Sequence, residues 1–242
     1  MSACAIRIGC AGWSLPREYA DRFPAQGTHL QRYASRLGCV EINSSFYRPH
    51  RPQTYARWAA SVPDDFRFSV KVPKQITHVL RLRDCIPALE EFLAQCGQLG
   101  EKLGCLLVQL PPSQVFEEEV ADVFFRSLRA RFAGHVVLEP RHESWVSAEP
   151  LLQARHIAQA IVDPSRISTD SKPGGWDGFK YWRLHGSPRI YYDAYDAVYL
   201  AQLEQTLSAA AQDGPVWCIF DNTAAGAAVG DALKLGDGYG SV

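Results

Sequence analysis

The chain has 242 residues, 47% of them hydrophobic and 21% charged, a balance that excludes a disordered protein and allows a sizeable core. Its formal net charge of −1 indicates no bulk attraction to nucleic acid or to a membrane, although a local basic patch is compatible with it. The first residues lack the features of a signal peptide, and no apolar run approaches the about 20 residues that span a bilayer. We therefore expect a cytoplasmic protein without a membrane partner.

Hydrophobic periodicity and turn residues divide the chain into eight strand-and-connection units. The expected strands cover residues 5–9, 39–47, 67–72, 105–110, 136–139, 159–163, 181–185 and 216–220. The expected helices cover residues 28–37, 54–61, 84–99, 117–132, 148–155, 197–212 and 224–235. Residues 164–180 are rich in proline and glycine and are expected to form a loop.

Strands that alternate with helices predict parallel pairing with right-handed crossovers. Eight such units in 242 residues match the size of a TIM barrel. A doubly wound open sheet is the alternative, but no G-x-G-x-x-G motif follows the first strand. We predict one α/β domain over residues 1–242, a (β/α)8 TIM barrel with an irregular connection between strands six and seven.

Polar side chains recur at the carboxyl ends of these strands, where the active sites of TIM barrels lie. Alternation along each strand selects the residues that would face the barrel interior, namely Glu41, Asn43, Ser69, Lys71, Gln109, Glu139, Arg141, Asp163, Arg183, His185 and Asn222. An internally satisfied ion-pair plug is the alternative interpretation. So many buried charges are costly to desolvate, which favours a functional pocket.

Roles follow from the chemistry of these side chains. Glu41 and Glu139 are candidates for a paired acid and base, as in glycoside hydrolysis, and His185 for a proton shuttle. The alternative is that each carboxylate only neutralises a cation, for example Glu139 beside Arg141. The candidate substrate-binding residues are Asn43, Lys71, Gln109, Arg141, Asp163, Arg183 and Asn222, of which the three cations suit a phosphate or carboxylate.

Five aromatic residues lie beyond strand ends, namely Trp13, Tyr47, Trp145, Tyr191 and Tyr195, of which Trp13, Tyr47 and Trp145 are candidate substrate-binding residues. Aromatic rings in such positions stack on bases or sugars, although packing beneath loops is the commoner reason for a tryptophan. Residues 221–227 lead from the last strand into a small-residue helix N-terminus, the usual phosphate position of this fold. An ordinary helix cap at Thr223 explains the same segment equally well.

No cofactor is predicted. The seven cysteines include no Cys-x-x-Cys pair, so zinc ribbons and iron–sulfur clusters are not indicated. A divalent metal could be held by Glu41, Glu139, Asp163 and His185. No local histidine signature supports this set, and the nearby cations oppose it.

Several motifs together resemble the YecE-like domain-of-unknown-function family. They are the segments at 9–14 (GCAGWS), 40–47 (VEINSSFY), 68–73 (FSVKVP), 107–112 (LVQLPP), 139–145 (EPRHESW) and 183–186 (RLHG). The resemblance covers nearly the whole chain and implies a TIM-barrel fold and a cytoplasmic, mostly microbial protein; it implies no reaction. The chain departs from the family pattern at Leu15, Pro140, Gly230 and residues 221–223.

We expect an enzyme, a hydrolase or an isomerase, that acts on a small anionic or sugar-like substrate by acid–base chemistry. One alternative is a ligand- or nucleic-acid-binding protein without turnover. The other is a metal-dependent hydrolase or isomerase. The sequence does not indicate an oligomeric state.

Overall fold

The computed structural model describes residues 6–239. Its strands are β1 (Ile6–Ala11), β2 (Cys39–Ile42), β3 (Arg67–Lys71), β4 (Leu103–Gln109), β5 (His135–Glu139), β6 (Ala158–Gln159), β7 (Ile161–Asp163), β8 (Gly174–Gly175), β9 (Lys180–Leu184) and β10 (Val216–Phe220). Its α-helices are α1 (His29–Ala34), α2 (Pro52–Ala60), α3 (Ile86–Cys96), α4 (Glu118–Arg129), α5 (Glu149–Ala154), α6 (Ala197–Ala210) and α7 (Ala227–Gly238). Short helices of other types are η1 (Arg17–Arg22), η2 (Ser44–Phe46), η3 (Gln75–Val79), η4 (Gly97–Lys102) and η5 (Glu143–Ala148).

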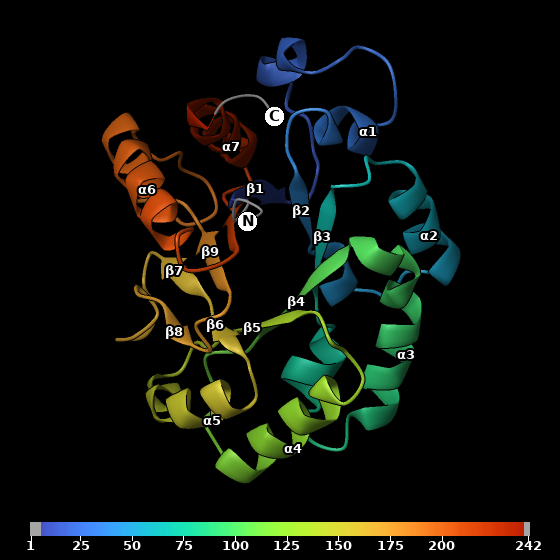
Figure 1. Ribbon diagram of the computed structural model, residues 1–242, viewed down its shortest axis with the longest axis vertical. Coiled ribbons are helices and arrows are strands. Elements are labelled where there is room, and N and C mark those ends of the chain that lie inside the picture. The colour runs from blue at the N-terminus through green and yellow to red at the C-terminus, as the bar shows by residue number, and fades with distance from the viewer. Residues whose placement is uncertain (1–5, 240–242) are drawn as a thin grey trace.

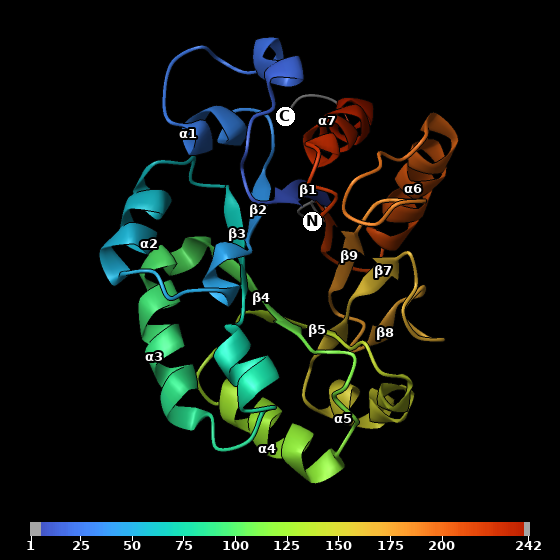
Figure 2. The same cartoon turned by 180° about the vertical axis from the view of Figure 1, so that it is seen from behind.

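The parallel strands curl into a nearly closed barrel. The order in the sheet is β7-β9-β10-β1-β2-β3-β4-β5-β6, with β8 antiparallel to β6. β6 and β7 are consecutive segments separated by Ala160, and β6 pairs with β5 whereas β7 pairs with β9. The two ends of the sheet therefore meet along one strand. The helices lie around the outside of the strands (Figure 1; Figure 2). The predicted TIM-barrel-like α/β fold is confirmed.

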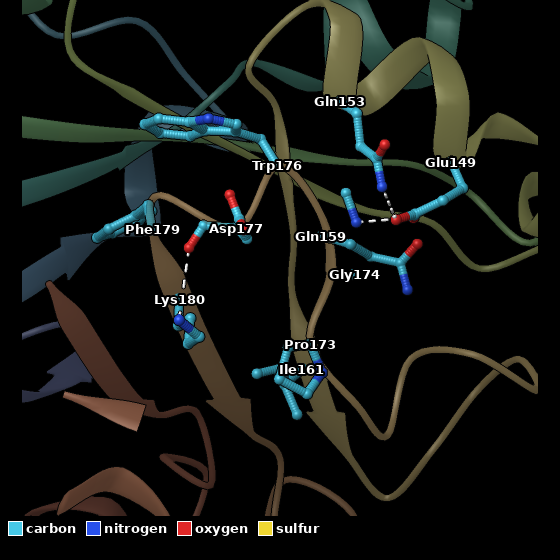
Figure 3. A pocket seen from close by; sticks show the side chains of 11 residues that line it. Glu149, Gln153, Gln159, Ile161, Pro173, Gly174, Trp176, Asp177, Phe179 and Lys180 are labelled. Atoms are coloured by element: carbon cyan, nitrogen blue, oxygen red, sulfur yellow. Dashed lines mark hydrogen bonds between the residues drawn. The ribbon is translucent and has the colours of Figure 1, made fainter. Parts of the chain in front are cut away.

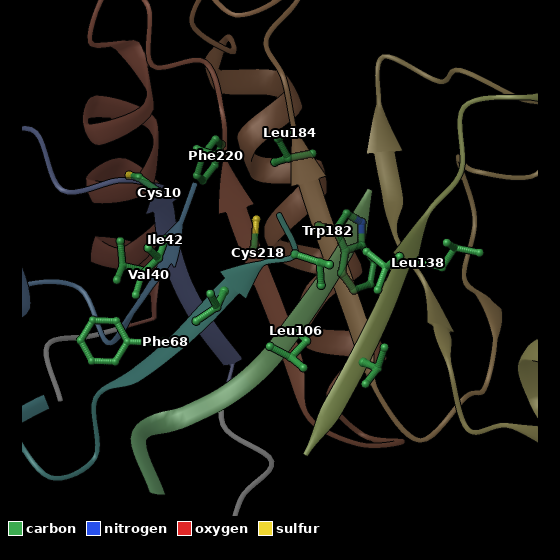
Figure 4. Packing of buried hydrophobic residues seen from close by; sticks show 14 of the residues in the cluster. Cys10, Val40, Ile42, Phe68, Leu106, Leu138, Trp182, Leu184, Cys218 and Phe220 are labelled. Carbon is green, nitrogen blue, oxygen red and sulfur yellow. The ribbon is translucent and has the colours of Figure 1, made fainter. Parts of the chain in front are cut away.

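The outward faces of the strands form the main hydrophobic core against the helices. This layer includes Cys10, Val40, Ile42, Phe68, Leu106, Leu138, Trp182, Leu184, Cys218 and Phe220 (Figure 4). A second apolar cluster lies inside the barrel, where Tyr181 and Trp217 stack with their ring centroids 6.2 Å apart. Because side chains fill this part of the interior, the barrel is a packed core rather than a pore.

One glycine is required by the spacing of the first two strands. A Cβ atom at Gly9 would lie 2.1 Å from the carbonyl oxygen of Cys39, on the neighbouring strand β2. Only glycine allows the two backbones this close approach. The position therefore contributes to the fold by lacking a side chain.

Several element boundaries differ from those expected. The second strand ends at Ile42 because Asn43 has helical dihedral angles and η2 follows. The sixth strand is interrupted at Ala160, and residues 164–180 include β8 and the first residue of β9. Thr223 is not a helix cap, because α7 begins after Gly226, which has φ +87°. Expected residue Ala5 lies outside the described residues. No helix between residues 6 and 239 has the length and hydropathy needed to cross a membrane.

Candidate functional site

Arg183 lies at the centre of a charged group inside the barrel. It projects from β9 toward Glu41 on β2 and Glu139 on β5, strands that are not its neighbours, so these two contacts are made across the interior. Arg183 Nε and Nη2 donate to the two oxygens of Glu41 over 3.1 and 2.9 Å, and Nη1 donates to Glu139 Oε2 over 3.1 Å. Nη2 also lies 3.0 Å from Asp221 Oδ2. Burial disfavours this charge, but the three carboxylates hold the pKa of Arg183 well above its usual value.

Tyr181 lies beneath this arginine, two residues earlier on β9. Its hydroxyl donates to Glu41 Oε2 over 2.9 Å and lies 3.0 Å from Ser69 Oγ. Side chains two apart on a strand share a face, so Tyr181, Arg183 and His185 form a column along one side of the interior. The Tyr181 ring belongs to the apolar cluster inside the barrel, and its hydroxyl contacts the charged groups nearer the carboxyl ends of the strands.

The upper end of the column is a histidine held by a carboxylate. Asp221 Oδ2 lies 2.9 Å from His185 Nδ1, and both residues are buried. Burial would raise the pKa of Asp221, but Arg183 and then His185 hold it below its usual value. His185 Nε2 lies 3.5 Å from Arg141 Nη2 and 3.7 Å from Glu139 Oε1. The imidazole is thus oriented from one side and faces an arginine–carboxylate pair on the other.

Glu139 and Arg141 form that pair. Arg141 Nε and Nη2 donate to Glu139 Oε1 over 2.8 and 2.6 Å. Burial alone would raise the pKa of Glu139, but Arg183 and Arg141 together hold it well below its usual value. The remaining nitrogen, Arg141 Nη1, makes only a long contact of 3.4 Å with the Tyr191 hydroxyl. Arg141 keeps 13% of its side chain exposed, which makes it accessible from the mouth of the barrel.

Lys71 is a cation in this region that makes no ion pair within the described part of the chain. It ends β3, is 6% exposed, and has Nζ 4.3 Å above the centre of the Phe46 ring. Burial, followed by the neighbouring Arg183, lowers the pKa of Lys71 to about 8. Its charge is therefore held less firmly than that of either arginine.

We call these side chains the barrel-mouth cluster: Glu41, Ser69, Lys71, Glu139, Arg141, Tyr181, Arg183, His185 and Asp221. Arg183 with its three carboxylates has the form of the ion-pair plug considered above. Lys71, Arg141 Nη1 and His185 Nε2 have no such complete set of partners among residues 6–239. The cluster thus combines a satisfied centre with incompletely bonded groups around it.

The remaining predicted binding residues divide into two groups. Gln109 is buried beside Glu139 on the neighbouring strand, and its Nε2 donates to the Leu110 carbonyl over 2.6 Å. Asn43 follows β2, and its buried Oδ1 lacks a hydrogen-bond partner within the described residues. Asp163 and Asn222 do not join the cluster. Asp163 accepts a hydrogen bond from Tyr195, and Asn222 donates to Asp231 on α7, so both contact the helical layer.

The three predicted aromatic residues also occupy different environments. Trp145 is 1% exposed and donates from Nε1 to the Gln114 carbonyl, which is a packing role beneath a loop. Trp13 is half-buried and packs edge-to-face on Trp58 of α2. Tyr47 is 69% exposed and packs edge-to-face on the ring of Phe46.

Sequence reasoning omitted Asp221 and Tyr181 from the candidate site and considered Tyr191 only as an aromatic residue beyond a strand end. Asp221 lies two residues beyond Ile219, which faces the interior, and this spacing was the available signal. Tyr181 shares the spacing of Arg183 and His185 on β9. Tyr191 packs edge-to-face on His185 from a loop and has φ +71°. No periodic signal in the sequence could have placed it there.

The four residues considered as metal ligands do not converge. Glu41 and Glu139 are engaged by Arg183, and Asp163 is directed to Tyr195. Between residues 6 and 239, no group of three or more histidine, cysteine, aspartate or glutamate side chains is arranged to hold a metal ion.

A hollow of about 210 Å³ lies between α5, β8 and the start of β9 (Figure 3). It is lined by Glu149, Gln153, Gln159, Trp176, Phe179, Lys180 and neighbouring residues. The Glu149 carboxylate is already bonded there, by Gln153 Nε2 over 2.8 Å and the Gly175 backbone N–H over 2.7 Å. None of the lining residues belongs to the barrel-mouth cluster, so this hollow is separate from the candidate site.

Comparison with known proteins agrees with this architecture. A family model described as "Protein of unknown function DUF72" matches residues 7–241. The chain belongs to the DUF72 family. It is 36% identical to the UPF0759 protein YecE of Escherichia coli K12 over 106 residues, which are 44% of this chain and 38% of YecE. It is 26% identical to YunF of Bacillus subtilis over 182 residues, 69% of this chain and 64% of YunF. These matches thus span less than two thirds of either relative, and the predicted YecE-like resemblance is confirmed.

Solved DUF72 structures show the same fold. A crystal structure of a DUF72 family protein from Thermotoga maritima aligns with a TM-score of 0.79 at 23% identity, covering 97% of this chain and 98% of that one. A DUF72 family protein from Enterococcus faecalis aligns with a TM-score of 0.78 at 23% identity, covering 96% and 94%. The barrel is therefore shared by this DUF72 member and both solved proteins.

Proposed function

We propose that the barrel-mouth cluster is the active site of an enzyme that acts on a small anionic substrate by acid–base chemistry. The observation that carries the proposal is the Asp221–His185 pair, with Nδ1 and Oδ2 2.9 Å apart and Nε2 turned toward Arg141. A carboxylate that orients one imidazole nitrogen leaves the other free for proton transfer. The pair lies at the carboxyl ends of the strands, where TIM-barrel active sites are built.

We assign different roles to the three groups first considered for catalysis. Both oxygens of Glu41 accept hydrogen bonds from Arg183, and the pKa of Glu139 is held well below its usual value. A carboxylate whose pKa is lowered in this way, as that of Glu139 is, acts as a fixed negative charge rather than a proton carrier, and both oxygens of Glu41 are engaged by Arg183. We therefore assign proton transfer to His185.

The anion is assigned to Arg141 rather than to Arg183. Arg183 is 1% exposed and all three of its nitrogens are bonded to carboxylates. Arg141 is partly exposed and retains donors on Nη1, which suit a carboxylate or phosphate oxygen.

A thermal-shift screen tests the proposal. Purified protein is mixed with inorganic phosphate, sugar phosphates, short carboxylates, nucleotides and oligonucleotides. A ligand at a hundredfold excess over its Kd stabilises the protein by about 2.7 kcal/mol, a shift of several degrees in Tm. We expect a small anion to produce this shift in the unmodified protein and in Arg126→Gln, a change of an exposed arginine on α4, but not in Arg141→Gln.

Turnover is then assayed on the ligand that the screen identifies. We expect His185→Gln to retain the thermal shift and to lose turnover, because the imidazole supplies the proton transfer. A shift that survives Arg141→Gln, or turnover that survives His185→Gln, would contradict the assignment. A response to oligonucleotides alone, falling steeply with salt, would replace the enzyme with a nucleic-acid-binding protein.

A further inference from the structure

Among residues 6–239, Lys71 is buried without the carboxylate partner that a buried ammonium normally has. The carboxylates of the barrel-mouth cluster are engaged by Arg183, Arg141 and His185. Lys71 Nζ instead lies over the face of Phe46, 4.3 Å from the ring centre. Buried charges are ordinarily paired, so an unpaired one in a charged cluster calls for a chemical explanation.

The surroundings of Lys71 favour its neutral amine. The charged or titratable groups around it are Arg183 from β9, Glu41 from β2, Glu139 from β5, Asp221 after β10 and His78 from η3. Burial and the Arg183 charge outweigh the carboxylates and lower the pKa of Lys71 to about 8. A desolvated lysine beside another cation is the recognised form of an amine nucleophile for carbonyl groups.

We propose that Lys71 forms a Schiff base with the carbonyl group of an anionic substrate, a compound of the 2-oxo acid class. The inference rests on the proposed function, because Arg141 binds the carboxylate and His185 transfers protons. Lys71 is then a catalytic residue and not only a positive charge. The substrate class narrows accordingly from small anions in general to anions that carry an aldehyde or ketone.

The reaction is a condensation without oxidation or reduction. The Nζ lone pair attacks the carbonyl carbon and a C–N bond forms; the carbonyl oxygen takes one proton and the nitrogen gives one up, which leaves a neutral carbinolamine. A second proton allows the C–O bond to break, and that oxygen leaves as water. The product is a protonated imine whose positive charge acidifies the adjacent carbon. His185, oriented by Asp221, donates and accepts these protons.

Reductive trapping tests the inference directly. The full chain is incubated with glyoxylate or with pyruvate, reduced with borohydride, and analysed by intact mass and by peptide mapping. We expect one adduct per chain, located on the peptide that contains Lys71 and increasing as the pH is raised through about 8. Mapping on the unmodified chain identifies the lysine without relying on the folding of any variant.

Two variants provide matched controls. Lys71→Arg keeps the positive charge but cannot form an imine, so the adduct should disappear. Lys74→Arg changes an exposed lysine three residues further along, so the adduct should remain at Lys71. Adducts scattered over surface lysines, or an adduct that persists in Lys71→Arg, would overturn the inference.

Pyruvate and lactate separate this inference from the proposed function, because both are small carboxylates and only pyruvate has a ketone. If pyruvate and lactate both produced thermal shifts that depend on Arg141, and no adduct was trapped, the anion site would be supported and the Schiff base would be excluded. An adduct at Lys71 that forms equally in Arg141→Gln would support the nucleophile and contradict the anion site. If no oxo acid produced either a thermal shift or an adduct, both the anion site and the Schiff base would be contradicted.

Discussion

Asp221 and His185 are joined by a contact of 2.9 Å between Oδ2 and Nδ1, and the same Asp221 oxygen lies 3.0 Å from Arg183 Nη2. A carboxylate only accepts hydrogen bonds, so Nδ1 of the imidazole carries the hydrogen. Asp221 therefore fixes the tautomer of His185 and neutralises part of the central arginine at once. One carboxylate couples the orientation of the proposed base to the ion pairs that hold the barrel mouth.

The tautomer can be measured in the resting protein. We expect NMR spectra of the imidazole nitrogens to show a hydrogen on Nδ1 of His185, directed at Asp221. Asp221→Ala removes the acceptor, and the two tautomers should then become comparably populated. A dominant Nε2–H form in the unmodified protein would contradict the assigned role of the imidazole.

Removing Arg183 should be severely destabilising, because Glu41 would lose its ion-pair partner and Glu139 and Asp221 would each lose one of their partners. We expect Arg183→Met to lower the free energy of unfolding by about 3–5 kcal/mol, measured by urea denaturation. Glu41→Gln in the same chain should restore part of the loss, since it removes one uncompensated charge. Arg126→Met, with an exposed side chain, should change stability by no more than about 0.5 kcal/mol. If Arg183→Met also lowered the free energy of unfolding by no more than about 0.5 kcal/mol, the ion pairs of the cluster would make no net contribution to stability.

Acid should weaken the fold through Glu139. Its pKa is held well below the usual 4.5, so the unfolded chain takes up a proton at a pH where the folded chain does not. The stabilisation is complete above about pH 4.5 and is lost as the pH falls toward the folded pKa. Below pH 4.5, Glu139→Gln should reduce the slope of unfolding free energy against pH by up to about 1.4 kcal/mol per pH unit. Equal slopes in urea titrations of both proteins would contradict the low pKa.

At neutral pH Lys71 should destabilise the fold, whereas Glu139 stabilises it, although stability rises with pH through both transitions. The pKa of Lys71 is about 8 in the folded chain against a usual 10.5, so the folded chain loses the proton first and stability rises with pH between these values. At pH 7, Lys71→Met should increase the free energy of unfolding by about 1–3 kcal/mol, because it removes a desolvated charge. The gain should shrink as the pH approaches 10.5. Lys74→Met serves as the exposed control; a destabilised Lys71→Met would mean that the ammonium is well paired.

The sequence was sufficient for the barrel and for much of its mouth. Alternating strands and helices predicted the fold. Charged residues at the ends of several strands indicated which face of each strand points into the barrel. Glu139 with Arg141, and Arg183 with His185, were placed correctly because each pair contrasts with apolar neighbours. Tertiary contacts were not needed to find them.

Strands without that contrast could not be assigned. β10 reads Val-Trp-Cys-Ile-Phe, in which every residue is apolar and buried, so either face could be the inner one. The expected alternation selected Asn222, whereas the structure directs Asp221 into the cluster. The same ambiguity, with small alanines at 158 and 160 facing inward, explains why Asp163 was expected there and contacts Tyr195 instead. The orientation of loop residues such as Tyr191 cannot be predicted from the alternation of side chains along a strand.

The column on β9 makes the arrangement of the site depend on the number of residues between its members. Tyr181, Arg183 and His185 share the inner face only because they lie two apart along a strand of five residues and its first successor. One residue inserted or deleted within β9 would place the side chains on either side of the change on opposite faces, which would break the column and present Trp182 or Leu184 to the carboxylates. Residues 164–179 precede the strand, so changes of length there leave the column unaltered. Length variation among relatives should therefore collect in that connection and be absent from the strand.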